Sequence, residues 1–204
     1  MKKKTLVIIL LTVFVISDNI YAQSFKEGTH VINVGVGFPN IPLLLLKTNG
    51  YNTSEHKTSG AGPIHLRYEY AFTSGFGIGL SVNFNSYNTN WNSKQVVNNT
   101  SITYNNSIKG SSLNLLVRAN KHWTVNEKID VYFGAGIGYN HRKYEEIIES
   151  ANNRTPTKSY GDAILPIGIE STVGARYYIT KNIGAYLDLG YAKDIIQTGI
   201  VARF

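Results

Sequence analysis

Apolar residues alternate with small or polar ones, at a period of two, along most of the chain. In residues 63–73, every second position from Ile64 to Phe72 is apolar or aromatic, and Arg67 and Glu69 stand between them. Successive side chains of an extended strand point to opposite faces, so this pattern predicts amphipathic β-strands. Eight segments fit the pattern: 29–38, 63–73, 76–85, 111–121, 129–140, 163–179, 183–192 and 195–204.

The connections between these segments alternate in length. Those at 74–75, 123–128 and 180–182 are short, those at 40–61, 88–110 and 141–161 are long, and 193–194 is short again. Transmembrane β-barrels have short turns at the periplasmic rim and longer loops outside, and an even strand number puts both termini at the periplasmic rim. The pattern therefore predicts an all-β, eight-stranded antiparallel up-and-down transmembrane β-barrel.

The long connection at 88–110 is rich in Asn, Ser and Thr, yet the alternation continues through Tyr87, Thr89 and Trp91. Two interpretations stay open for this segment. Either the two flanking strands continue as an exposed hairpin, whose edge can pair with strands of a partner, or the segment is a mobile polar loop.

The first residues predict a cleaved signal peptide over residues 1–22. A basic start of three lysines is followed by an apolar run over residues 5–16 and by Ala22, a small residue before the cleavage point. This run is too short to span a bilayer as a helix, which needs about 20 residues. Residues 23–204 then form one barrel domain with a formal net charge of +5, because the first 22 residues carry +2 of the total of +7. The excess favours an acidic partner such as lipopolysaccharide, and no arginine-rich helix indicates nucleic acid.

The two faces of the predicted strands differ in composition. The apolar face is nearly free of charge and carries aromatic residues near the strand ends: Tyr68, Tyr70, Phe72, Tyr139, Tyr177, Tyr191 and Phe204. Aromatic residues form girdles at both membrane interfaces of outer-membrane barrels, so we expect the apolar face to point to lipid. A soluble periplasmic barrel that binds an apolar ligand has the faces reversed and remains an alternative.

The inward face then carries eight charged residues whose formal charges cancel: Arg67, Glu69, Arg118, Asp130, Glu170, Arg176, Asp188 and Arg203. We expect four of them near mid-height (Arg67, Glu69, Glu170 and Asp188) and the other four nearer the periplasmic rim. Eight strands leave an interior just wide enough for side chains. We therefore interpret the charges as a structural plug that holds the barrel in register, rather than as a selectivity filter or a gate.

Strand adjacency predicts two contacts among these charges. Arg118 and Asp130 lie on neighbouring strands and are expected to pair. Glu170 and Asp188 are also neighbours and carry like charges, so they need a shared cation, either Arg67 or Arg176.

The sequence holds no motif for catalysis, for a cofactor or for a metal. Glycine-rich phosphate loops, nucleophile elbows and zinc-protease motifs are absent, and the histidines at 30, 56, 65, 122 and 141 have no metal-ligand spacing. None of these histidines is followed two positions later by Ser, the pair that lipid A deacylases place at the membrane. We therefore expect a protein that is not an enzyme.

The predicted signal peptide, the eight strands, the loop asymmetry and the terminal strand ending in Phe204 together resemble the small outer-membrane β-barrel proteins of the OmpA-barrel, OmpX and OmpW type. The resemblance covers residues 27–204 and is one of pattern, so no functional residue carries over. It implies an outer-membrane location and recognition of the C-terminal strand, with Phe204, by the barrel-assembly machinery. It also implies a role in envelope integrity or adhesion, with an external protein or surface ligand at the outer loops 40–61, 88–110 and 141–161. An OmpW-like narrow channel or carrier for small solutes is the alternative.

Overall fold

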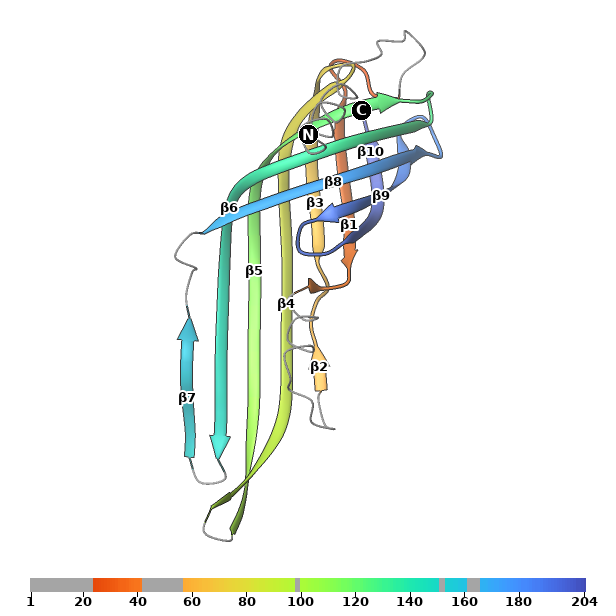
Figure 1. Cartoon of the computed structure of the whole chain (residues 1–204). Coiled ribbons are helices and arrows are strands. Elements are labelled where there is room, and N and C mark those ends of the chain that lie inside the picture. Colours follow the sequence, from red (N-terminus) through yellow and green to blue (C-terminus); the bar gives the residue numbers. More distant parts are fainter. Residues whose placement is uncertain (1–23, 42–56, 98–99, 151–152, 161–165) are drawn as a thin grey trace, which may run out of the picture.

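The computed structural model of the chain (Figure 1) describes residues 24–41, 57–97, 100–150, 153–160 and 166–204. The predicted signal peptide at residues 1–22 lies outside the described residues and stays a prediction. Most of the predicted outer loop at 40–61 also lies outside them.

Eight strands close into one antiparallel barrel. They are β1 (His30–Phe38), β3 (Ile64–Thr73), β4 (Phe76–Val97), β5 (Thr100–Thr124), β6 (Ile129–Ser150), β8 (Ile167–Tyr178), β9 (Ile183–Tyr191) and β10 (Ile196–Arg203). β1 closes the barrel by pairing with both β3 and β10, so that Gly35 lies opposite His65 on one side and Gly199 on the other. The predicted eight-stranded up-and-down barrel is confirmed. Among the described residues, no helix is long and apolar enough to cross a membrane.

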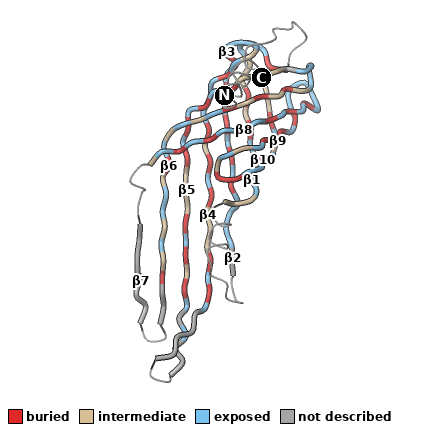
Figure 2. The backbone as a smooth tube through the Cα atoms, in the orientation of Figure 1, coloured by how far each residue is buried: buried red, intermediate tan, exposed pale blue. Residues whose placement is uncertain are grey.

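Burial alternates along the strands as the sequence pattern predicts (Figure 2). In β8, exposed and buried residues alternate over all 12 positions. The exposed positions carry large apolar side chains, such as Ile137 and Ile200 with exposed fractions of 62% and 65%, which form an apolar belt around the barrel. Lipid solvates such a belt and water does not. The apolar face therefore points outward as predicted, and the alternative with the apolar face inside is wrong.

Both termini of the described chain lie at one end of the barrel, which we call the terminal end (Figure 1). Polar side chains stabilise the short turns at this end by hydrogen bonds to the backbone. Asn126 Oδ1 accepts hydrogen bonds from the backbone N–H groups of Lys128 (2.8 Å) and Ile129 (2.9 Å), and the Thr180 hydroxyl accepts one from Ile183 N–H (3.0 Å). These side chains replace backbone partners that the turn residues lack, so few residues suffice for each connection.

At the opposite end, β4, β5 and β6 continue well beyond the barrel (Figure 1). β7 (Asn153–Tyr160) pairs with the extension of β6, and β2 (Lys57–Ser59) pairs with that of β4. We call this projecting sheet the blade: β2, β7 and residues 88–97, 100–110 and 141–150.

The blade replaces two of the predicted outer loops. Residues 88–110 and 141–161 are β-strand over most of their length, so their prediction as loops is wrong and the hairpin interpretation of 88–110 is confirmed. Residues 88–110 form strands because the alternation of the barrel strands continues through them. Thr89 and Trp91 continue the inward face of β4, and Thr89 lies opposite Ile108 of β5. All three side chains are buried.

Candidate functional site

Arg67 of β3 lies in the middle of the bore and joins two acids. Its Nη1 donates to Asp188 of β9, and its Nη2 donates to Gln197 of β10. The same Nη2 lies 3.7 Å from Glu170 Oε2 of β8. Arg67 is therefore the cation that the two neighbouring acids share, and Arg176 does not take this role.

Arg118 of β5 compensates Glu170 from the other side of the bore. Its Nη1 donates to Glu170 Oε1 at 2.6 Å, and its Nε donates to Asn120 Oδ1 at 2.7 Å. Asn83 donates to the second oxygen of Glu170 at 2.9 Å. The central cluster, Arg67, Arg118, Glu170 and Asp188, thus has no net formal charge and is hydrogen-bonded across the barrel, as buried ions require.

A second cluster, the terminal cluster, fills the bore toward the terminal end: Glu69, His122, Asp130 and Arg176. Arg176 donates to Glu69 at 2.6 Å and to Asp130 at 3.2 Å. The two ring nitrogens of His122 face Glu69 Oε1 at 2.7 Å and Asp130 Oδ1 at 2.9 Å. Ionised carboxylates only accept hydrogen bonds, so this geometry suits a doubly protonated imidazole, which balances the charge of the cluster.

Glycine on the inward face makes room for these long side chains. A Cβ atom on Gly134 would overlap Arg118 Nη2, and one on Gly174 would overlap Asp188 Oδ1. Glycine at these two positions therefore has a steric cause. Gly134 and Gly174 each lie where a charged side chain crosses the narrow bore.

The predicted Arg118–Asp130 pair is not formed, and this prediction is wrong. In the β5–β6 register, Arg118 lies opposite Gly136 and Asp130 lies opposite Thr124. Six residues along the strand separate the two levels, or about 20 Å at the rise of a strand. The predicted depths also change, because Arg118 joins the central cluster and Glu69 joins the terminal cluster.

Arg203 differs from the other seven predicted charges. It makes no ion pair with a carboxylate of the described chain and instead donates to three backbone carbonyls, those of Ser24, Lys181 (2.7 Å) and Glu127 (3.2 Å). Its guanidinium lies 3.9 Å from the ring centroid of Tyr178. Arg203 thus ties the N-terminal segment to two turns at the terminal end.

Phe25 closes the bore at the terminal end. Its side chain is fully buried, and its ring stacks on that of His122 with a centroid distance of 3.6 Å and an interplanar angle of 9°. The neighbouring Ser24 hydroxyl donates to Ile129 O at 3.1 Å. The sequence reasoning did not include this plug, because Phe25 precedes the first strand and belongs to no alternating segment.

We expect Phe25→Ala to lower the free energy of unfolding by about 3 kcal/mol, because it leaves a cavity beside the His122 ring. The measurement is the urea dependence of the folded fraction in detergent, read from heat-dependent gel mobility. Lys26→Ala alters the next, exposed side chain and serves as the control. Equal unfolding midpoints for the two variants would show that Phe25 does not seal the bore.

The turn between β9 and β10 closes the other end of the bore. Asp194 is fully buried and accepts hydrogen bonds from His65 Nε2 at 2.5 Å and Gln197 Nε2 at 2.7 Å. His65 Nδ1 lies 2.7 Å from Asn83 Oδ1, and Asn83 contacts Glu170. One chain of polar contacts therefore runs from this turn to the central cluster.

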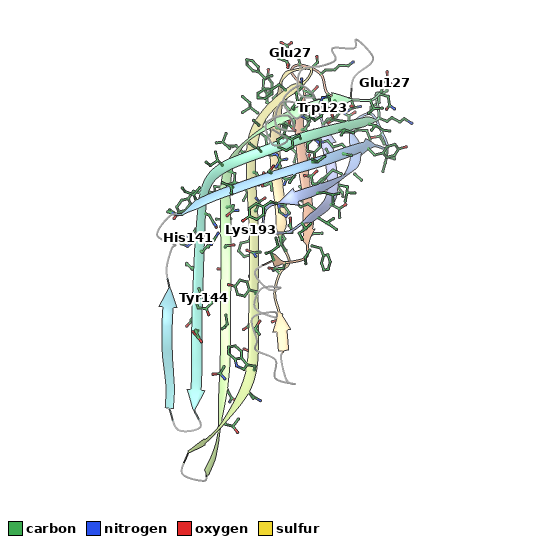
Figure 3. The ribbon with its side chains drawn as sticks, viewed as in Figure 1. Glu27, Trp123, Glu127, His141, Tyr144 and Lys193 are labelled. Carbon is green, nitrogen blue, oxygen red and sulfur yellow. The ribbon has the colours of Figure 1, made fainter. Side chains whose placement is uncertain are left out.

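Lys193 precedes Asp194 in the same turn. Its side chain lines a cleft of about 600 Å³ at the mouth of the barrel, between the barrel and the blade. We call it the mouth cleft. Figure 3 shows Lys193 at this junction, with His141 and Tyr144 on the β6 part of the blade. Burial lowers the pKa of Lys193 to about 8, and the positive charge of Arg142 lowers this pKa too, while Asp194 acts in the opposite direction.

Two histidines of the polar network could have been predicted from the alternation of inward and outward positions along the strands. His65 stands two positions before Arg67, and His122 stands four after Arg118, so both belong to inward faces. Asp194 gave no such signal, because it lies in a turn. Within the described part of the chain, no three His, Asp or Glu side chains are grouped to hold a metal ion.

No family model matches this sequence, and no curated protein matches it significantly. Among solved structures, the N-terminal β-barrel domain of OprF from Pseudomonas aeruginosa is similar with a TM-score of 0.45 and 14% identity, over 88% of this chain and 98% of that domain. Ail, the attachment invasion locus protein of Yersinia pestis, gives a TM-score of 0.41 and 16% identity over 88% of this chain and all of that one. The outer membrane protein OprG from Pseudomonas aeruginosa gives a TM-score of 0.44 and 11% identity, over 90% of this chain and 99% of that one.

Proposed function

We propose that this chain is an outer-membrane β-barrel protein with a closed bore that acts in envelope integrity or surface interaction, and that it is not an enzyme. The observation that carries the proposal is the polar network that fills the bore between Phe25 and Asp194. Its charged groups are bonded to one another across the barrel and are not exposed to a passing solute. Because side chains fill the bore, we expect the outer surfaces of the barrel and the blade to carry the function.

The larger clefts support a role for the blade end. Among the described residues, clefts of about 570, 600 and 520 Å³ lie along the blade and at the mouth, and a cleft at the terminal end measures about 260 Å³. In the proposed orientation the terminal end is periplasmic and the blade is extracellular, as in other outer-membrane barrels. An external protein or surface ligand then meets the blade, which contains the described parts of the segments 88–110 and 141–161, or the segment 40–61.

Two further partners belong to the proposal. The apolar belt contacts outer-membrane lipid, and the net charge of +5 predicted for residues 23–204 suits lipopolysaccharide. The barrel-assembly machinery would recognise β10 with Phe204, whose backbone pairs with His30 and whose ring faces outward. Residues 1–22 would direct export as a signal peptide.

The alternative, a narrow channel or carrier, requires an open path past Arg67, Glu69, Glu170 and Asp188. We expect no single-channel current from refolded residues 23–204 in a planar bilayer, because these side chains are tied to partners across the bore. Folding is confirmed by heat-dependent gel mobility, and a general porin shows that the assay detects an open bore. Reproducible current steps that change when Glu170→Gln and Asp188→Asn are combined would overturn the closed bore and favour the channel.

A further inference from the structure

Three buried polar atoms in the middle of the bore have no hydrogen-bond partner among the described residues. They are Nδ2 of Asn33 on β1, Nε of Arg67 on β3 and the hydroxyl oxygen of Tyr186 on β9. At most 5% of the surface of each of these residues is exposed, so bulk solvent does not reach the three atoms. An unpaired buried donor destabilises a fold, so each of the three groups needs a partner.

The strand register brings the three atoms to one place. Asn33 and Arg67 lie opposite one another in the β1–β3 ladder, and both side chains point inward. Arg67 reaches from there to Gln197 of β10, which pairs two inward positions further along β1. Its side chain therefore passes the level of Gly35, the inward position in between. The Tyr186 hydroxyl lies over Gly35, because a Cβ atom on this glycine would overlap it. The three atoms thus border one volume beside Gly35.

The polarity of the three groups identifies the kind of molecule that fits between them. The Asn33 and Arg67 nitrogens only donate, whereas the Tyr186 hydroxyl can donate or accept. The molecule must therefore accept two hydrogen bonds at one atom. A halide ion would add an uncompensated negative charge beside Glu170 and Asp188, in a cluster that has no net formal charge. A water molecule accepts two bonds without adding charge and donates a third to the Tyr186 oxygen, and about three bonds are usual for a buried water.

Asn33 has a special position on the first strand of the barrel. The other inward positions of β1 are Val31, Gly35 and Gly37, and none of these has a side chain that can form a hydrogen bond. Among the described residues of β1, Asn33 is therefore the one inward side chain that can join the polar network. Because β1 pairs with both β3 and β10, a water bound to Asn33 would link the strand that closes the barrel to the central cluster.

We propose that the bore binds one internal water molecule beside Gly35, which accepts hydrogen bonds from Arg67 Nε and Asn33 Nδ2 and donates one to the Tyr186 oxygen. The Arg67 guanidinium then contacts the acids of the central cluster through its two Nη atoms and β1 through Nε. The inference does not depend on which end of the barrel faces outward or on what the blade binds. It therefore stands or fails separately from the proposed function.

Crystals of refolded residues 23–204, with one crystal soaked in sodium bromide, test the site directly. We expect one ordered oxygen atom within about 3.2 Å of both Arg67 Nε and Asn33 Nδ2, without an anomalous bromide signal. A bromide peak at this position would overturn the water and assign the site to a halide. A direct contact between the Asn33 amide oxygen and Arg67 Nε would also overturn the inference, as would a site without any ordered atom in a crystal that shows other buried waters.

Stability in detergent gives a second readout. Asn33→Leu and Tyr186→Phe each remove one partner of the water, and we expect each variant to lower the urea midpoint of unfolding. The double variant should lose less than the sum of the two single losses, because the second substitution removes a contact that the first has already weakened. The two side chains do not bond to each other directly, so such coupling requires a molecule between them.

The control for this coupling combines Asn33→Leu with Tyr177→Phe. The Tyr177 side chain is 52% exposed on the outward face, so its effect should simply add to that of Asn33→Leu. Additive losses for Asn33→Leu and Tyr186→Phe as well would overturn the shared water, even if both variants are less stable than the native chain. The crystals contain the native chain, so the first test decides the inference if the variants do not fold.

Discussion

Replacing Arg176 by methionine is expected to lower the free energy of unfolding by about 3–5 kcal/mol, because it leaves two buried carboxylates without their guanidinium partner. Glu69 and Asp130 would then share only His122, and their like charges would no longer be balanced. The measurement is the urea dependence of the folded fraction in detergent.

A compensating variant separates charge balance from simple loss of packing. Adding Glu69→Gln to Arg176→Met leaves Asp130 opposite His122 with no net formal charge, and we expect most of the lost stability to return. Lys181→Met removes an exposed cation in a turn and should change stability by less than about 0.5 kcal/mol. If Arg176→Met unfolds with the native midpoint, the terminal cluster does not stabilise the barrel.

Gly199→Val is expected to block folding or to cost at least about 3 kcal/mol, because the new side chain has no space at the seam that closes the barrel. Gly199 of β10 lies opposite Gly35 of β1. A Cβ atom on Gly199 would overlap the carbonyl oxygen of Val34, which is backbone and cannot move without breaking the ladder between the first and last strands. The fraction of refolded protein with heat-dependent mobility measures the effect.

Ala185→Val is the matched control for this seam variant. Ala185 of β9 pairs with Ile200 and is exposed on the outward face, so two added methyl groups meet lipid instead of a neighbouring strand. We expect native folding for this control. Native folding of Gly199→Val as well would mean that the β1–β10 seam adapts more freely than the close approach of its backbones indicates.

The fold and its faces could be predicted from the sequence because both depend only on strand parity. Positions such as Arg67 and Glu170 fall between outward apolar residues, so their inward direction follows from the period of two. The apolar belt with Ile137 and Ile200 identified the lipid-facing side for the same reason.

The pairing of the inward charges could not be predicted, because it depends on how far neighbouring strands are shifted along one another. The alternation along the strands places both Arg118 and Asp130 inside the barrel. Only the β5–β6 register shows that their positions along the strands differ by six residues. The plug at Phe25 and the cap at Asp194 lie outside the strands, where parity gives no information. Lys193, which faces the mouth cleft, belongs to the shortest connection at the blade end, where composition gave no signal.

Because the register between β4 and β5 is unbroken, the blade keeps its two faces only if each strand is lengthened by an even number of residues. The two strands pair from Phe76 opposite Lys121 to Val97 opposite Thr100 without a shift. Two residues added to each strand lengthen the blade and keep Trp91 on its face, whereas one added residue exchanges the two faces of everything nearer the tip unless a bulge absorbs it. The reach of this protein from the membrane can therefore change in steps of about 6.6 Å, two strand residues at a time, while the bore below stays the same.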